Sequence, residues 1–374
     1  MTAIQENLAH VVDDHADHHH EHPSWLAHHF DDAEQQYDSG KLGMWLFLVT
    51  EVLFFSGMFC AYALYRNRNP EVFEFCSSFL NEKLGAINTG VLLFSSLTMA
   101  WAVRAAQLRQ HQLLVGMLGA TLGCAAIFLG VKAVEYSHKM EIGLLPGKLY
   151  VAQLDGAHGP HKGYLEFICT VPAIVTALCA FYAIYAFATK SLFHQRVAGP
   201  MLVAGLCFFG GVGLGQYLEA QEEASKGHGG HAAGHEHHAM VDGHVDHGSH
   251  EHAAAPESVH AAETKTAAEI AASAATAMGG TPNVYVSPTE LKTPNADVNQ
   301  RSMAGLFFSI YYCMTGVHAI HIIGGMIVIT WLIVKAAREE FHEQYFGPVD
   351  NVGLYWHLVD FIWIYLFPLL YLIT

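Results

Sequence analysis

Long apolar runs separated by polar loops make up most of this chain. Seven of the runs carry few charges and reach the length, about 18 residues or more, that an α-helix needs to cross the hydrocarbon of a bilayer. The pattern therefore predicts an all-α membrane protein built as a bundle of seven transmembrane helices. The predicted spans are residues 42–65, 86–103, 112–131, 167–189, 197–218, 303–334 and 352–373.

The sixth predicted span is longer than a bilayer requires. With 32 residues where about 20 suffice, residues 303–334 should tilt or project beyond the lipid. Small residues offer close-packing faces in two other spans, where Gly119-x-x-x-Gly123 and Gly211-x-x-x-Gly215 fit the GxxxG pattern. Because this spacing also arises by chance, it marks either a helix contact or nothing.

Two histidine-rich polar tracts frame the predicted membrane part. Residues 10–29 hold eight histidines, and ten more lie between His228 and His260. Such tracts bury too little apolar surface to offset their ordering entropy, so both should be disordered. The predicted organisation is a disordered tail (1–40), helices one to three (41–139), a region with helices four and five (140–218), a disordered loop (219–302) and the last two helices (303–374).

Net charge and cysteine spacing each exclude one possibility. The chain has a formal charge of −16 and no basic patch, which excludes a nucleic-acid partner. Its seven cysteines lie mostly in apolar spans without CxxC spacing, so they are expected to be apolar fillers and not a disulfide framework.

Loop charges bear on orientation. The loops on the N-terminal side of the spans are shorter and denser in Lys and Arg, which favours a cytoplasmic N-terminus and a periplasmic C-terminus. Residues 1–40 contain no Lys or Arg and so cannot begin a secretory signal. We therefore expect a multi-pass protein of a bacterial inner membrane.

Glu51 is the first ionisable side chain deep inside a predicted span. It lies near the middle of residues 42–65, where an ionised group costs roughly 2.5–3.5 kcal/mol. The carboxyl group must therefore be neutral or held by a partner. It is either a proton-linked site or a structural anchor between helices.

Two histidines share one face of the sixth span. His318 and His321 are three residues apart, which places both rings on one side of a helix. Together with Glu51 they offer the two imidazoles and one carboxylate of a metal site. The alternative is a hydrogen bond from one histidine to Glu51, with the other ring bonded to a backbone carbonyl or a lipid head.

The last span carries His357 and Asp360, again three residues apart. This pair either relays protons or joins the seventh helix to its neighbours or to a partner subunit. Near the end of the third span, Lys132 and Glu135 form an i, i+3 pair at the expected membrane edge. We expect an interfacial ion pair there, with the lysine reaching toward the headgroups.

In their order, these motifs resemble subunit III of the haem–copper terminal oxidases, typified by cytochrome c oxidase. The family's longer members begin with two further helices that this chain lacks, and residues 140–302 look like an insertion with two added spans. The matching segments are Gly43-Met44-Trp45-Leu46-Phe47 through Glu51 to Gly57, Ile87-Asn88-Thr89-Gly90 running to Trp101-Ala102, Val134-Glu135-Tyr136, Thr315-Gly316-x-His318-x-x-His321, and Trp356-His357-x-x-Asp360.

The resemblance implies a core of five family helices and an inserted two-helix hairpin that closes the family's lipid-holding cleft. It implies no catalytic residue, metal ligand or redox cofactor in this chain. Haem and copper would belong to partner subunits, with subunit I as the main contact, subunit II as another, and phospholipid bound. Glu51 and one of His318 and His321 would form a buried pair in a dry interior, and Trp356, His357 and Asp360 would join the last helix to its neighbours.

The implied function is that of a non-redox subunit of a proton-pumping oxidase, which holds lipid and supports subunit I and its proton uptake. The histidine-rich tail is either a proton-collecting antenna or a solvated tail with no role. The antenna would comprise His10, His15, His18, His19, His20 and His22. Two alternatives stay open: a divalent-metal transporter with His-rich loops, and subunit III of a quinol oxidase.

Overall fold

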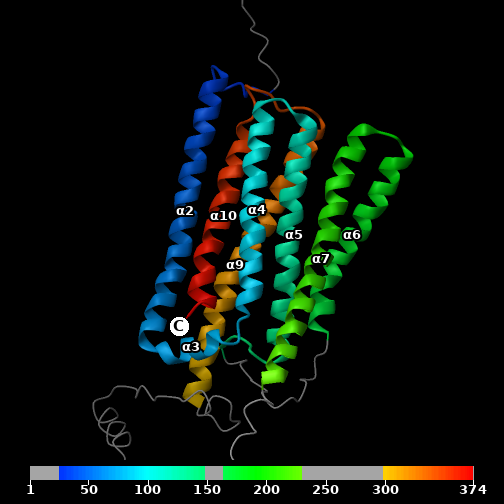
Figure 1. Ribbon diagram of the computed structural model, residues 1–374. Helices are drawn as coiled ribbons and strands as arrows, with labels where there is room; N and C mark the ends of the chain where they lie inside the picture. Colours follow the sequence, from blue (N-terminus) through cyan, green and yellow to red (C-terminus); the bar gives the residue numbers. More distant parts are fainter. Residues whose placement is uncertain (1–24, 148–162, 230–297, 374) are drawn as a thin grey trace, which may run out of the picture.

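The computed structural model describes residues 25–147, 163–229 and 298–373, with side chains except at 222–229 and 298–302. This part of the chain forms eight α-helices and no β-strand (Figure 1), which confirms the all-α class. The helices are α2 (Ala33–Arg68), α3 (Pro70–Ser77), α4 (Glu82–Gln107), α5 (His111–Glu141), α6 (Tyr164–Ala188), α7 (Leu192–Gly229), α9 (Val298–Ala337) and α10 (Gly347–Tyr371).

Seven of these helices are long and apolar enough to cross a membrane, which confirms the seven predicted spans. The exception is α3, a helix of eight residues between α2 and α4. The sixth span is part of α9, whose 40 residues form a rod about 60 Å long against about 30 Å of hydrocarbon. With 38 residues, α7 is nearly as long. Both helices therefore extend beyond a bilayer.

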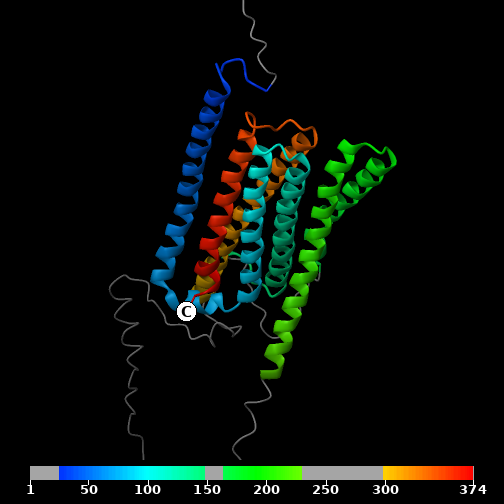
Figure 2. The same cartoon turned by 45° about the horizontal axis from the view of Figure 1, so that its top comes forward.

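Four helices, α4, α5, α9 and α10, pack against one another as a central bundle (Figures 1 and 2). The bundle encloses large side chains such as Trp356, Trp363 and Phe128. At one edge α2 lies along α10, with few contacts to the rest. At the opposite edge the hairpin of α6 and α7 lies against the bundle, with α7 on α5 and α6 outermost.

Glycines let α5 and α7 approach closely. A Cβ atom built on Gly119 would lie 2.9 Å from the Cβ of Pro200, and one built on Gly211 would lie 2.9 Å from the Cα of Ile127. Main chain therefore packs on main chain, as in other membrane helix pairs with small residues at the contact. The other members of the two GxxxG patterns, Gly123 and Gly215, face Cys207 and Val134 in the same interface. Both patterns mark a helix contact.

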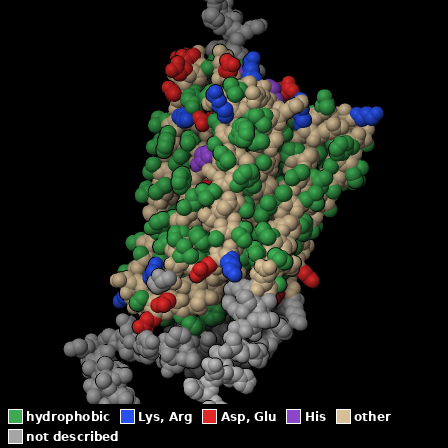
Figure 3. All heavy atoms as spheres, viewed as in Figure 1, with side chains coloured by type: hydrophobic (Ala, Val, Ile, Leu, Met, Phe, Trp, Pro, Cys, Tyr) green, Lys and Arg blue, Asp and Glu red, His purple; other side chains and the backbone are tan. Residues whose placement is uncertain are grey.

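Apolar side chains cover the middle of the molecular surface. Figure 3 shows them over one whole face, with charged side chains gathered at the two ends. On α6, Phe167, Phe181 and Phe187 are each at least 70% exposed. This is the distribution expected where acyl chains surround the protein and water meets its two ends.

The predicted disordered tail, residues 1–40, extends too far. Helix α2 begins at Ala33 because Asp32 caps it, accepting a hydrogen bond from a main-chain N–H in the first turn at 2.7 Å. The next turns attach to α10, since Tyr37 donates to Asp350 at 2.8 Å and Lys41 forms an ion pair with the same carboxylate at 2.8 Å. Polar residues at the start of α2 are thus helical and tied down.

The predicted loop 219–302 is also too long at both ends. Helix α7 continues to Gly229, and α9 begins at Val298. After the apolar run, α7 is rich in Ala, Gln and Glu, which are strong helix formers that propagate a helix without apolar packing. The rest of both polar tracts lies outside the described residues.

Candidate functional site

A carboxyl and an imidazole group meet between α2 and α9. Glu51 Oε2 and His321 Nε2 lie 2.9 Å apart, within hydrogen-bonding distance. The second ring nitrogen, Nδ1, lies 2.8 Å from the carbonyl oxygen of Val317, one turn back in α9. Phe55 packs edge-on to the imidazole, with ring centres 5.2 Å apart. Of the two histidines that the sequence offers, the structure therefore brings His321 to Glu51.

The hydrogen bonds fix how many protons this pair holds. A carbonyl oxygen only accepts, so Nδ1 of His321 must carry a hydrogen and donate it to Val317. Nε2 then either accepts from a protonated Glu51 or donates to an ionised one. In both arrangements the pair is neutral overall and shares one proton between Oε2 and Nε2. The site is therefore suited to holding a single exchangeable proton without a net charge inside the membrane.

The pair is half-buried, which corrects the expectation of a dry interior. The side chain of Glu51 is 18% exposed and that of His321 is 19% exposed. Because α2 contacts the rest of the protein along a narrow strip, its outer face stays open, and Val52 and Phe54 are each more than 50% exposed. The carboxyl group of Glu51 is therefore partly exposed beside this open face.

His318 belongs to a different part of the core. It is fully buried, and its ring stacks on Trp363 at 5.3 Å, with Phe128 edge-on at 5.6 Å. Three residues advance a helix by about 300°, which leaves the two rings about 60° apart around α9. Only His321 therefore reaches Glu51, and the three-ligand metal site considered from the sequence is not formed. Among the described residues, no group of three His, Cys, Asp or Glu side chains is placed to hold a metal ion.

Side chains of the last helix join it to α4. Trp356 Nε1 donates to Ser95 Oγ at 2.7 Å, and His357 Nδ1 lies 2.6 Å from Ser96 Oγ. Asp360 is buried beside Ser96. Within the described ranges no hydrogen bond links Asp360 to His357. These residues thus face α4, as a role in joining helices requires, and do not form a relay with each other.

A buried charge cluster lies between α5, α9 and α10. Glu135 is 2% exposed, and its Oε2 accepts a hydrogen bond from the Lys132 ammonium at 2.7 Å. Its Oε1 accepts from Lys139 at 2.8 Å, from Tyr311 at 2.9 Å and from Tyr371 at 2.5 Å. Both lysines are also buried. One carboxylate thus serves two ammonium groups and two hydroxyls in the protein interior.

Lys132 and Glu135 form the expected i, i+3 ion pair, but both side chains are buried among helices and do not reach out toward headgroups. With 31 residues, α5 continues past the depth at which its apolar run ends, and the still longer α9 covers it there. Tyrosine hydroxyls supply the hydrogen bonds that headgroups would otherwise make. The sequence did contain a sign of this cluster: Lys132, Glu135 and Lys139 stand at positions i, i+3 and i+7, which places three charges in one row on the same helix face.

The six histidines considered as a proton antenna lie outside the described residues. The first tract enters the structure only at His28 and His29, both exposed. His29 packs against Phe30 with ring centres 4.1 Å apart. The antenna therefore stays a prediction.

The fold and these sites define an all-helical, multi-pass membrane protein held together by buried polar contacts. In a comparison with family models, residues 24–162 and 295–374 match cytochrome c oxidase subunit III. The match covers more than half of the chain and includes Glu51, the Glu135 cluster and α10. The chain therefore belongs to the cytochrome c oxidase subunit III family. Residues 163–294, which contain α6 and α7, are unmatched.

Curated relatives match over shorter stretches. A heme-copper oxidase subunit I+III of Aeropyrum pernix is 39% identical over 71 residues, 19% of this chain and 9% of that protein. Cytochrome c oxidase subunit 3 of Thermostichus vulcanus is 39% identical over 70 residues, 18% of this chain and 35% of the relative. A probable cytochrome c oxidase subunit 3 of Mycobacterium tuberculosis is 37% identical over 65 residues, 17% and 32% of the two chains.

The matched stretches therefore span about a third of the length of these subunit 3 relatives, and less than a tenth of the fused protein. No solved structure matches the chain significantly.

Proposed function

We propose that this protein is a non-redox subunit of a proton-pumping respiratory oxidase that reduces O2 to water, and that it holds phospholipid and stabilises subunit I and its proton uptake. Family membership supports this role. The relative named subunit I+III supports subunit I as the main neighbour. We propose subunit II as a further member of the same complex. Haem and copper would reside in these partners.

The observation that carries the proposal is the Glu51–His321 pair. It lies in the part of the chain that matches the family, its two side chains are within hydrogen-bonding distance, and both are partly exposed. A neutral proton-holding pair at a subunit's surface can support proton handling in an adjoining subunit without a redox group of its own. The inserted hairpin would close a lipid-holding cleft, which stays a prediction.

The proposed location is a bacterial inner membrane, with the N-terminus in the cytoplasm and the C-terminus in the periplasm. Seven candidate spans in the described residues, an odd number, support ends of the membrane part on opposite sides. The Lys and Arg content of the short loops supports this orientation.

Purification of the protein from its native membrane, followed by a haem spectrum of the preparation, tests the proposal. We expect haem-bearing subunits to co-purify and to consume O2 with reduced cytochrome c as donor. A complex that accepts electrons only from a quinol would assign the protein to a quinol oxidase. A haem-free preparation enriched in a divalent metal would instead support a transporter.

A further inference from the structure

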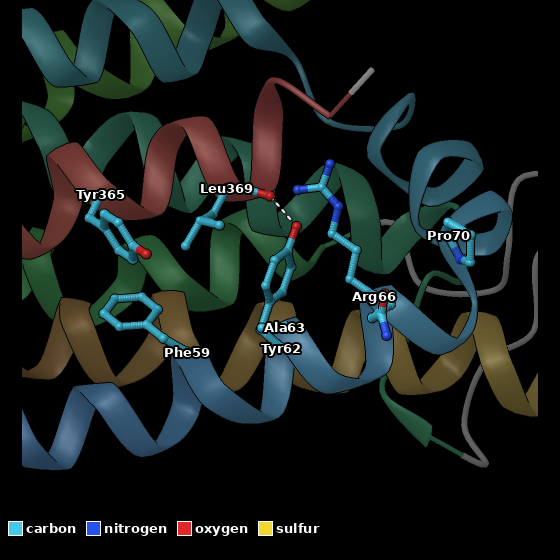
Figure 4. A pocket seen from close by; sticks show the side chains of 8 residues that line it. Phe59, Tyr62, Ala63, Arg66, Pro70, Tyr365 and Leu369 are labelled. Atoms are coloured by element: carbon cyan, nitrogen blue, oxygen red, sulfur yellow. Dashed lines mark hydrogen bonds between the residues drawn. The ribbon is translucent and has the colours of Figure 1, made fainter.

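A crevice opens between the ends of α2 and α10, next to the start of α3. Figure 4 shows the side chains that line it, and its volume is about 370 Å³. It is separate from the Glu51–His321 pair, since its lining on α2 begins at Phe59, about two turns beyond Glu51, and Arg66 lies about four turns beyond it. Its position at the end of two membrane spans places it where acyl chains give way to headgroups.

The inner part of the crevice is apolar and faces the surrounding membrane. Phe59 on α2 and Tyr365 on α10 pack edge to face across it, with ring centres 4.7 Å apart. Tyr365 is 54% exposed, so this aromatic pair is open to the bilayer. Ala63 and Leu369 complete the wall with small or aliphatic surface. A hydrocarbon chain is the natural occupant of such a surface in lipid.

The outer part of the crevice carries hydrogen-bond donors and a positive charge. Tyr62 is buried and donates its hydroxyl hydrogen to the carbonyl oxygen of Leu369 in the last turn of α10. The guanidinium of Arg66 is turned back toward that hydroxyl (Figure 4). Asn67 adds an amide on the same rim.

Arg66 retains donors for a ligand. A guanidinium has five N–H groups in a planar fork that matches phosphate oxygens, and neither Tyr62 nor the nearby end of α10 can use them all. No carboxylate lines the crevice, and in the described part of the chain no ion pair joins Arg66 to an acidic side chain. The charge at the rim is therefore complementary to an anion.

We propose that this crevice binds one anionic phospholipid, with its phosphate on Arg66 and Asn67 and an acyl chain along Phe59 and Tyr365. The inference rests on the lipid-holding part of the proposed function and gives it a site and a ligand class. A charge-assisted contact between arginine and phosphate supplies the specificity, and the aromatic wall supplies the apolar contact. A zwitterionic headgroup fits less well, because no acidic side chain in the crevice meets its ammonium group.

The test compares lipid retention in variants of the full-length protein, purified in mild detergent with its co-purifying subunits. Arg66→Gln removes the charge, and Ala63→Trp fills the crevice without changing the charge. Arg68→Gln is the matched control, because Arg68 lies two residues after Arg66 and does not line the crevice. We expect mass spectrometry of extracted lipid to show about one anionic phospholipid fewer in the first two variants and no loss in the control.

A titration distinguishes the source of the phosphate. Short-chain phosphatidylglycerol should raise the thermal midpoint of the wild type and of Arg68→Gln, but not of Arg66→Gln. Inorganic phosphate and short-chain phosphatidylcholine should have little effect on any of them. Equal lipid retention in all variants, or equal stabilisation by the two lipids, would overturn the proposal. The proposed oxidase role is judged separately by the haem spectrum, which these variants should leave unchanged.

Discussion

At Glu135, a single carboxylate balances two buried ammonium groups. The arrangement leaves one excess positive charge in the interior, where isolated ions are costly. Aromatic faces share in offsetting this charge, because the Lys132 ammonium lies 4.5 Å from the ring centre of Trp363. The cluster therefore depends on its one acidic member.

Replacing Glu135 should destabilise the protein strongly. We expect Glu135→Gln to lower the free energy of unfolding by about 3–5 kcal/mol, because breaking a buried ion pair leaves the partner charges uncompensated. Thermal unfolding in detergent measures the loss. Glu141→Gln, an exposed position on the same helix, should change the midpoint little. Similar midpoints for the two variants would mean that the cluster is not stabilising.

The shared proton of the Glu51–His321 pair gives a chemical test. A membrane-soluble carbodiimide reacts with protonated carboxyl groups, and the carboxyl group of Glu51 is partly exposed. We expect Glu51→Gln to abolish most labelling of this chain while haem content stays intact. Glu71→Gln, at an exposed site in α3, should leave the labelling unchanged. Loss of haem in Glu51→Gln would contradict the proposed role and point to direct involvement with a cofactor.

At the scale of elements, the attachment of α7 to the rest of the protein has three parts. Glycines allow close contact with α5 along its middle. At one end Arg196 forms an ion pair with Glu339 at 2.6 Å, and at the other His138 lies 3.0 Å from Glu219. The hairpin is therefore fixed along its length although the family model does not include it.

The glycine contact can be tested by adding side-chain volume. We expect Gly211→Ile to cost about 1–3 kcal/mol, since its Cβ would lie 2.9 Å from the Cα of Ile127 and force the helices apart. Gly213→Ile is the matched control, because a Cβ there meets nothing within 4 Å. Thermal midpoints of the two variants measure the difference. Equal midpoints would show that the close approach of α5 and α7 does not contribute to stability.

The Arg196–Glu339 ion pair at the start of α7 predicts a pH dependence. The hydrogen bond and charge of Arg196 lower the pKa of Glu339 below its ordinary value. The stabilisation is therefore present above the ordinary glutamate pKa and is lost as the pH falls through the lowered pKa of the folded state. We expect Glu339→Gln to lower the thermal midpoint slightly at neutral pH and to equal the wild type in strong acid. A midpoint difference that persists in acid would contradict this.

At the scale of the whole molecule, the sequence predicts the spans well, because run length reports directly on burial in lipid. The length of the apolar run does not reveal that α2 begins at Ala33. Its first turns are polar and are held by Asp32 and by Asp350 in another helix. The choice between His318 and His321 depends on which side of α9 meets α2. The depth of Glu135 depends on how far neighbouring helices extend. Each of these features depends on how the helices pack together, which the spacing of residues along one helix does not determine.

The histidine-rich tail can be tested as one unit. If it collects protons, deleting residues 1–30 should slow proton uptake and turnover of the purified oxidase most at high pH, where protons are scarce. The deletion stops short of the cap of α2 at Asp32, so the bundle should stay folded. Unchanged uptake at high pH would leave the tail without this role.

The lengths of α7 and α9 have a consequence for the segment that connects them. Both are close to twice the thickness of the hydrocarbon layer, and Figure 1 shows their ends at Gly229 and Val298 reaching below the neighbouring helices. The chain therefore leaves α7 and enters α9 at points beyond the thickness that a hydrocarbon layer can cover.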